Sequence, residues 1–238
     1  IMDNFAAALS KVVTWIINFA PFGILGLVFD TVSTNGLQVF TEYGRLLAVL
    51  VGSMLFIYFV TNPILVYWCI RQNPFPLIFK CLKRSAVTAF FTRSSAANIP
   101  INMEVCEEMG LDKDTYSVTI PLGATINMDG TAIYQGVCVI FIATCFGVDL
   151  TIGQQLTIIL TATLASIGTA GVPGAGMIML AMVLQSVGLP VEGIALVAGI
   201  DRIFDMGRTT VNITGDAACT LCVSKMEEKR QAQKKTEA

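Results

Sequence analysis

The chain has 238 residues, of which 54% are hydrophobic and 13% are charged, with a net charge of −2 and a mean hydropathy of +0.70. Soluble domains carry about 25% charged residues, so half that share, together with long uncharged runs, indicates that lipid is the solvent. The absence of histidine excludes Ser-His-Asp and Cys-His catalysis and any His-ligated metal, and the basic residues form no patch interleaved with aromatics of the kind that binds nucleic acid.

The predicted elements follow one another as apolar stretches of membrane-spanning length or somewhat less. Residues 1–45 are expected to hold part of a helical scaffold, including a helix near Val12–Val32, and residues 46–84 a span, Leu46–Ile70, with a basic cytoplasmic link. The remaining elements are a first hairpin (85–110), an interrupted span (115–148), a second hairpin (152–190), an amphipathic final span (193–224) and a cytoplasmic tail (225–238). Because the chain begins with Ile1 and lacks a signal-peptide pattern, we expect it to be a piece of a longer protein.

Two segments, Ser85–Met109 and Ile152–Val187, have apolar arms around a centre rich in serine or glycine. Each arm is shorter than the roughly 20 residues that cross a bilayer, and irregular backbone at membrane depth is tolerated only inside protein or beside a cavity. We therefore expect two re-entrant hairpins whose tips meet in mid-membrane; an ordinary kinked span is the alternative. The basic residues of Arg71–Arg84 and Lys225–Lys235 predict a cytoplasmic location for both stretches, so the first hairpin enters from the cytoplasm and the second from outside.

The strongest functional signal is a polar stripe in the final span. Its members are Asp201, Asp205, Arg208, Asn212 and Asp216. Because each residue of an α-helix turns by about 100°, this spacing places them on one face. A charge at membrane depth costs at least about 2.5–3.5 kcal/mol, so such residues face inward and are paired. We interpret the stripe as a site for an acidic amino acid, in which Asp205 binds the ammonium group, Arg208 a carboxylate and Asn212 fixes orientation; a structural ion-pair ladder is the alternative.

A second signal interrupts the apolar run of the broken span. Asp129 is the only charged residue between Tyr116 and Val148, and it lies in the sequence Asn-Met-Asp-Gly-Thr. An unwound helix here frees carbonyl groups, and hard cations prefer carbonyl and carboxylate oxygens. The carbonyls in question belong to Gly123, Thr125, Asn127 and Met128. The pattern indicates a sodium site; the alternative is an aspartate that caps the second half-helix.

The hairpin tips give a third signal. Arg93–Asn98 offers hydroxyl groups and backbone amides to an anion. Gly168–Gly176 supplies the flexible backbone that suits a gate. The second tip lacks the Gly-Lys-Ser/Thr of a phosphate-binding loop, so nucleotide binding is not expected.

Together these motifs resemble the dicarboxylate/amino acid:cation symporter family, which includes glutamate and aspartate transporters. The resemblance covers nearly the whole chain and is strongest from Thr88 to Lys225. It is carried by Thr92–Ser95, Pro121–Thr131, Ser166–Gly174 and Asp205–Asp216. The resemblance implies an all-α, multi-pass plasma-membrane protein with broken helices and two re-entrant hairpins. It further implies sodium-driven uptake by an elevator movement against a trimeric scaffold.

The resemblance also implies roles for particular residues. Those that would contact the substrate are Ser95, Thr131, Val172, Gly176, Asp205, Arg208 and Asn212. One sodium site would use Gly123, Asn127, Asn212 and Asp216, and a second would use Thr125, Met128, Ser166, Ile167 and Thr169. Asp129, with Asn127, would serve a third site. An arginine at the position of Arg208 is typical of the glutamate and aspartate members and favours an acidic substrate.

Two departures from the family pattern leave alternatives open. The first three family helices and part of the fourth are absent; because the third helix completes the third sodium site and the transport domain in the family, this chain alone is not expected to transport. The first tip, Ser94–Pro100, is more similar to bacterial serine/threonine members, so a serine/threonine or C4-dicarboxylate symporter is the alternative, with protons as an alternative coupling ion.

An intramembrane hydrolase is disfavoured because no lysine lies in a span and Asp205 and Asp216 are about 16 Å apart along the helix. A channel is disfavoured by the closed tips, and no enzymatic activity is expected.

Overall fold

The structure, a computed structural model, describes residues 38–237 together with Phe29 and Ser33. The helix expected near Val12–Val32, and most of the scaffold assigned to residues 1–45, lie outside the described residues. Within the described part the chain is helical and contains no strand. The first elements are α2 (Gln38–Phe56), the π-helical turn η1 (Ile57–Thr61), α3 (Asn62–Ile70), α4 (Phe75–Cys81), the π-helical turn η2 (Leu82–Ala86), α5 (Val87–Thr92), the short η3 (Ala96–Asn98) and α6 (Ile99–Glu108). They are followed by α7 (Lys113–Ile126), α8 (Asp129–Cys145), α9 (Ile152–Ile167), α10 (Ala175–Ser186), η4 (Val191–Gly193), α11 (Ile194–Ala198) and α12 (Asp201–Glu237).

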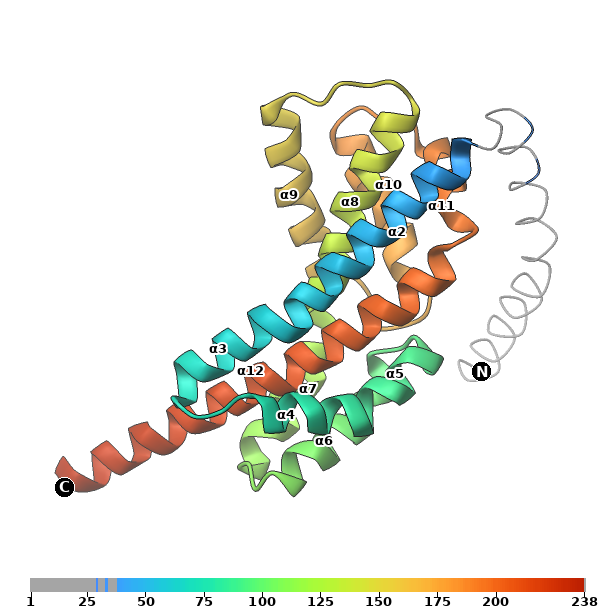
Figure 1. The fold of residues 1–238 in the computed structure, drawn as a ribbon. Helices are drawn as coiled ribbons and strands as arrows, with labels where there is room; N and C mark the ends of the chain where they lie inside the picture. The colour runs from blue at the N-terminus through green and yellow to red at the C-terminus, as the bar shows by residue number, and fades with distance from the viewer. Residues whose placement is uncertain (1–28, 30–32, 34–37, 238) are drawn as a thin grey trace, which may run out of the picture.

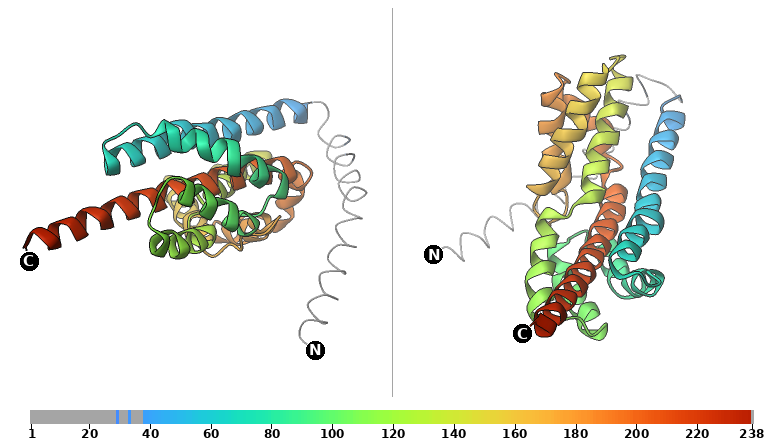
Figure 2. Two further views of the ribbon diagram at one scale, coloured as in Figure 1. Left: turned by 90° about the horizontal axis from the view of Figure 1, so that it is seen from below. Right: turned by 90° about the vertical axis from the view of Figure 1, so that its left-hand side faces the viewer.

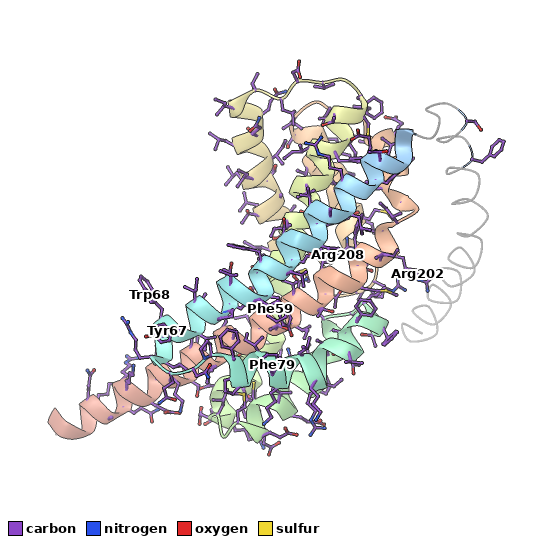
Figure 3. The ribbon with its side chains drawn as sticks, in the orientation of Figure 1. Phe59, Tyr67, Trp68, Phe79, Arg202 and Arg208 are labelled. Carbon is purple, nitrogen blue, oxygen red and sulfur yellow. The ribbon has the colours of Figure 1, made fainter. Side chains whose placement is uncertain are left out.

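The first long helix, α2–η1–α3, is continuous and apolar. Pro63 has no N–H and would clash with the carbonyl one turn earlier, and the π-helical turn η1 widens the helix at that point. Thr41–Ile70 is long and apolar enough to cross a membrane. Tyr67 and Trp68 project outward near its end (Figure 3), 50% and 75% exposed, as aromatic side chains do at a membrane–water interface.

The helix after the first hairpin is broken in two. Asp112 caps the start of α7 by accepting a hydrogen bond from the Thr115 amide. At Asn127 and Met128 the backbone leaves the helical region, and α8 begins at Asp129. The stretch Lys113–Cys145 that contains this break is the second candidate span among the described residues.

Two antiparallel helix pairs, α5–α6 and α9–α10, approach the break from opposite ends of the molecule (Figure 1). Their tips meet: the Ser94 hydroxyl and the Ala96 amide both donate to the Gly171 carbonyl, at 2.7 and 3.0 Å. A Cβ at Gly171 would lie 2.9 Å from a backbone oxygen of α7, so only glycine allows this approach.

Helix α12 runs through the middle of the molecule and packs against α3, α5, α7 and α8 (Figures 1 and 2). The final span expected at residues 193–224 is therefore two elements: α11 is separate, and α12 begins at Asp201. The helix also continues through the basic tail to Glu237. The described part is thus an all-helical structure with long apolar helices, as expected for a membrane transporter.

Candidate functional site

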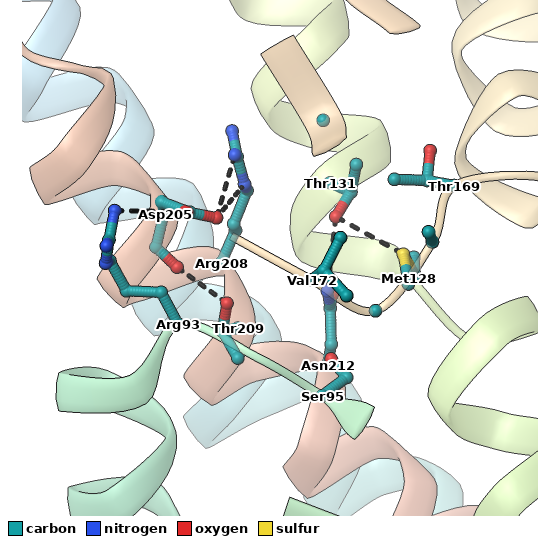
Figure 4. Close-up of a pocket in the computed structure, with 13 residues that line it drawn as sticks. Arg93, Ser95, Met128, Thr131, Thr169, Val172, Asp205, Arg208, Thr209 and Asn212 are labelled. Carbon is teal, nitrogen blue, oxygen red and sulfur yellow. Dashed lines mark hydrogen bonds and ion pairs between the residues drawn. The ribbon is translucent and has the colours of Figure 1, made fainter. Parts of the chain in front are cut away.

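A polar pocket lies where the two tips meet α8 and α12 (Figure 4). Its lining includes every residue expected to contact the substrate, namely Ser95, Thr131, Val172, Gly176, Asp205, Arg208 and Asn212. The free volume is about 10 Å³, close to what one water molecule needs. The tips therefore close tightly over the site.

The stripe of α12 faces this pocket and the core beneath it, and all of its members are buried. Arg208 is only 2% exposed. Its guanidinium donates to Asp205 Oδ1 from Nε at 3.0 Å, with Nη2 at 2.8 Å from the same oxygen, and to Asp201 Oδ1 from Nη1 at 3.0 Å. The Tyr134 ring lies 4.2 Å from the guanidinium carbon, in a cation–π contact. The charge of Arg208 is thus already compensated by two carboxylates.

Asp205 connects both tips to α12. Its Oδ2 accepts a hydrogen bond from the Gly174 amide at 3.0 Å and lies 3.7 Å from Nη1 of Arg93 (Figure 4). Arg93 stands in the left-handed region with φ of 56°, which is uncommon for a residue with a side chain. The sequence placed Arg93 in the first tip and Asp201 in the polar stripe, but it predicted a substrate contact for neither of them.

Asn212 is held in one orientation by α8. Its Oδ1 accepts from the Gly130 amide at 2.8 Å and its Nδ2 donates to the Thr131 hydroxyl at 3.1 Å. A Cβ at Gly130 would stand 2.6 Å from the Arg208 carbonyl oxygen, so the glycine permits α8 to start directly against α12.

The structure also brings together the residues expected for the first sodium site. Asn127 Nδ2 donates to Asp216 Oδ1 at 3.0 Å and to the Asn212 carbonyl at 3.4 Å. Gly123 packs so closely that a Cβ there would lie 2.6 Å from Asp216 Oδ1. These groups supply carboxylate, amide and carbonyl oxygens, the ligands that hard cations prefer.

The residues expected for the other sodium sites are less tightly gathered. Met128 and Thr169 both line the pocket, but the hydroxyls of Ser166 and Thr169 donate to carbonyls of their own helix segment. Thr125 and Ile167 are exposed. Asp129 is also exposed in the first turn of α8, and it forms no ion pair with the residues that the structure describes.

Comparison with known proteins places this geometry in context. The family model of the sodium:dicarboxylate symporter family matches residues 1–226. The chain belongs to this family. The sodium:dicarboxylate symporter family consists of transporters and not of enzymes, and the resemblance drawn from the motifs is confirmed.

Several relatives of this family member carry the same name. The chain is 43% identical over 221 residues to the serine/threonine transporter SstT of Bifidobacterium adolescentis, covering 90% of this chain and 51% of that protein. It is 42% identical over 236 residues to SstT of Streptococcus thermophilus, covering 97% and 58%, and 48% identical over 180 residues to SstT of Streptococcus suis, covering 76% and 50%. The chain spans about half the length of these curated relatives.

Proposed function

We propose that the complete protein is a cation-coupled symporter that carries serine and threonine across the plasma membrane. The sequence favoured glutamate or aspartate because of Arg208, with serine/threonine or a C4-dicarboxylate as the alternative. The names of the relatives support the alternative better than the acidic substrates.

The charge balance of the pocket is the observation that carries this proposal. Arg93 and Arg208 face Asp201 and Asp205, so the cluster sums to zero. A zwitterion with a neutral side chain adds no net charge to it. An acidic substrate would bring one further negative charge into this neutral, buried cluster, and burying a net charge is costly.

The contacts support a role for each group. The Arg93–Asp205 contact, at 3.7 Å, is the longest ion pair of the cluster, so the substrate ammonium group takes the place of Arg93 beside Asp205. The substrate carboxylate lies against the serine-rich first tip at Ser95, and Thr131 and Asn212 offer polar partners to a side-chain hydroxyl. Val172 and Gly176 of the second tip close the site.

Sodium is the proposed coupling ion, with protons as the alternative. The carboxylate of Asp216 lies beside Asn127 at the unwound backbone, and Asp129 begins α8 directly after the break. Carboxylates beside free carbonyl groups suit a hard cation. The paired helices α5–α6 and α9–α10 are proposed to be re-entrant hairpins entering from the cytoplasm and from outside, in a trimeric complete protein that moves its substrate domain against a scaffold.

Uptake of labelled serine by the complete protein in proteoliposomes tests the proposal. We expect uptake with an inward sodium gradient and none when choline replaces sodium. Unlabelled threonine should compete, whereas aspartate and succinate should not. Competition by aspartate at the concentration at which threonine competes would contradict the assignment of substrate, and uptake in choline driven by a proton gradient would contradict the assignment of ion.

A further inference from the structure

Three cysteines gather where α3 meets the second half of α12, roughly 15 Å along that helix from Asn212. Cys69 lies in the last turn of α3, and Cys219 and Cys222 follow one another on α12 at the Cys-x-x-Cys spacing. The two helices pack against each other (Figure 1), and Cys222 is buried in the apolar cluster against which Cys69 packs. All seven cysteines of the chain, every one of which the structure describes, are free thiols.

Two hydrogen bonds fix how the two helices are aligned at this point. The Cys222 thiol donates to the Leu65 carbonyl, with sulfur and oxygen 3.9 Å apart, and the Lys229 ammonium group donates to the Cys69 carbonyl at 3.4 Å. Because side chains of a helix lean toward its N-terminus, the Cys69 side chain leans back toward the turn of α3 that Cys222 contacts. The side chains of Cys69 and Cys222 are accordingly hydrogen-bonded to each other.

The two thiols differ in their access to water. Cys222 is only 5% exposed, whereas Cys69 is partly exposed and follows directly after the outward-facing Tyr67 and Trp68 (Figure 3). The contact with the exposed Lys229 places a charged side chain of the tail beside the last turn of α3. A water-soluble reagent therefore reaches Cys69 and not Cys222. An accessible thiol next to a second, resolving cysteine is the arrangement found in redox-sensing sites.

We propose that Cys69 and Cys222 form a peroxide-sensitive thiol pair, which closes to a disulfide and links α3 covalently to α12. In the first step the Cys69 sulfur attacks hydrogen peroxide, the O–O bond breaks, and a sulfenic acid and water are formed. In the second step the Cys222 sulfur attacks the sulfenic acid, and the S–O bond breaks with loss of a second water. The two thiols thereby give up two electrons and two protons to the peroxide. Cytoplasmic thiol reductants reopen the bond by exchange, so the pair responds to the redox state on the side that the sequence assigns to the cytoplasm.

Peptide mapping of the complete protein in proteoliposomes tests the pair. The folded protein is treated with hydrogen peroxide and then unfolded, the remaining thiols are blocked with a maleimide, and the peptides are identified by mass spectrometry with and without dithiothreitol. We expect a linked pair of peptides that contains Cys69 and Cys222, is lighter than their sum by two hydrogen atoms and separates in dithiothreitol. Cys81 and Cys106 belong to the same apolar cluster but are 0% and 1% exposed, so they should remain thiols and serve as the internal control.

Three serine variants assign the two steps. Cys222→Ser should leave the sulfenic acid of Cys69 open to trapping by dimedone, whereas Cys69→Ser should give neither a trapped sulfenic acid nor a link at Cys222. Cys219→Ser, one turn away on α12, is the matched control and should form the link as the wild type does. A link from Cys69 to Cys219 instead, or no link between Cys69 and Cys222 in the wild-type protein, would overturn the proposal. So would equal oxidation of Cys81 and Cys106, because the reaction would then take place on unfolded protein.

Discussion

Asp201 offers the sharpest test of how the pocket selects its substrate. Asp201→Asn keeps the shape of the side chain and one acceptor oxygen but removes the negative charge that faces Nη1 of Arg208 at 3.0 Å. The cluster of Arg93, Arg208, Asp201 and Asp205 then changes from zero to one positive charge. We expect the second carboxylate of a bound aspartate to compensate Arg208 in place of the Asp201 carboxylate.

The size of the effect follows from the contact that is exchanged. A hydrogen bond between charged groups contributes about 1.5–3 kcal/mol, which corresponds to roughly a 10- to 150-fold gain in aspartate affinity at 1.4 kcal/mol per tenfold. Serine should keep its affinity, because its proposed contacts with Asp205 and Asn212 are unaltered. Without ligand the variant should be less stable, because an uncompensated buried charge costs about 3–5 kcal/mol.

Calorimetric titration of the complete protein with serine and aspartate in saturating sodium measures both affinities, and thermal unfolding measures stability. Asp149→Asn, at an exposed carboxylate outside the pocket, is the matched control. Aspartate should raise the unfolding temperature of Asp201→Asn but not of the control. If aspartate binds both variants equally weakly while both remain folded, the charge of Arg208 does not govern selectivity and the argument from charge balance fails.

Other predictions concern packing, coupling and closure. Gly130→Ala places a Cβ 2.6 Å from a backbone oxygen of α12 and should lower stability by about 1–3 kcal/mol in thermal unfolding, whereas Gly136→Ala, which has open space around it, should not. Asp216→Asn should greatly reduce the increase in serine affinity that sodium causes; titrations with and without sodium that still show the wild-type increase would contradict its role. Ser94→Ala removes the hydrogen bond to the Gly171 carbonyl and should weaken tip closure by about 0.5–1.5 kcal/mol, read as faster amide exchange at both tips.

The sequence predicted those features that depend on local periodicity and composition. The stripe from Asp201 to Asp216 followed from helical spacing, because polar residues in an apolar helix need a buried, paired environment. The break at Asn127 and Met128 followed from a polar pentapeptide inside an apolar run. Each feature depends on one continuous segment of the chain, so it can be predicted from a single sequence.

Contacts between distant segments could not be predicted in this way. The pairing of Arg93 with Asp205 depends on a left-handed residue at one tip and on the depth of α12, and no local pattern specifies either. The preference for an acidic substrate had a different origin, because it rested on the resemblance, in which an arginine at the position of Arg208 is typical of glutamate and aspartate members. The structure shows that this arginine is shared between Asp201 and Asp205 of its own helix.

The position of Asp205 explains why closure and selectivity belong to one event. Its Oδ1 holds Arg208, while its Oδ2 accepts the Gly174 amide of the second tip and faces Arg93 of the first. A substrate ammonium group that replaces Arg93 at this carboxylate removes one of the contacts that hold the first tip, and the contact of the second tip through Gly174 remains. Arg93→Gln should therefore weaken the attachment of the first tip alone, with faster amide exchange in α5–α6 and unchanged exchange in α9–α10. Equal acceleration in both helix pairs would show instead that the tips open together, held by the Ser94–Gly171 contact rather than by the carboxylate.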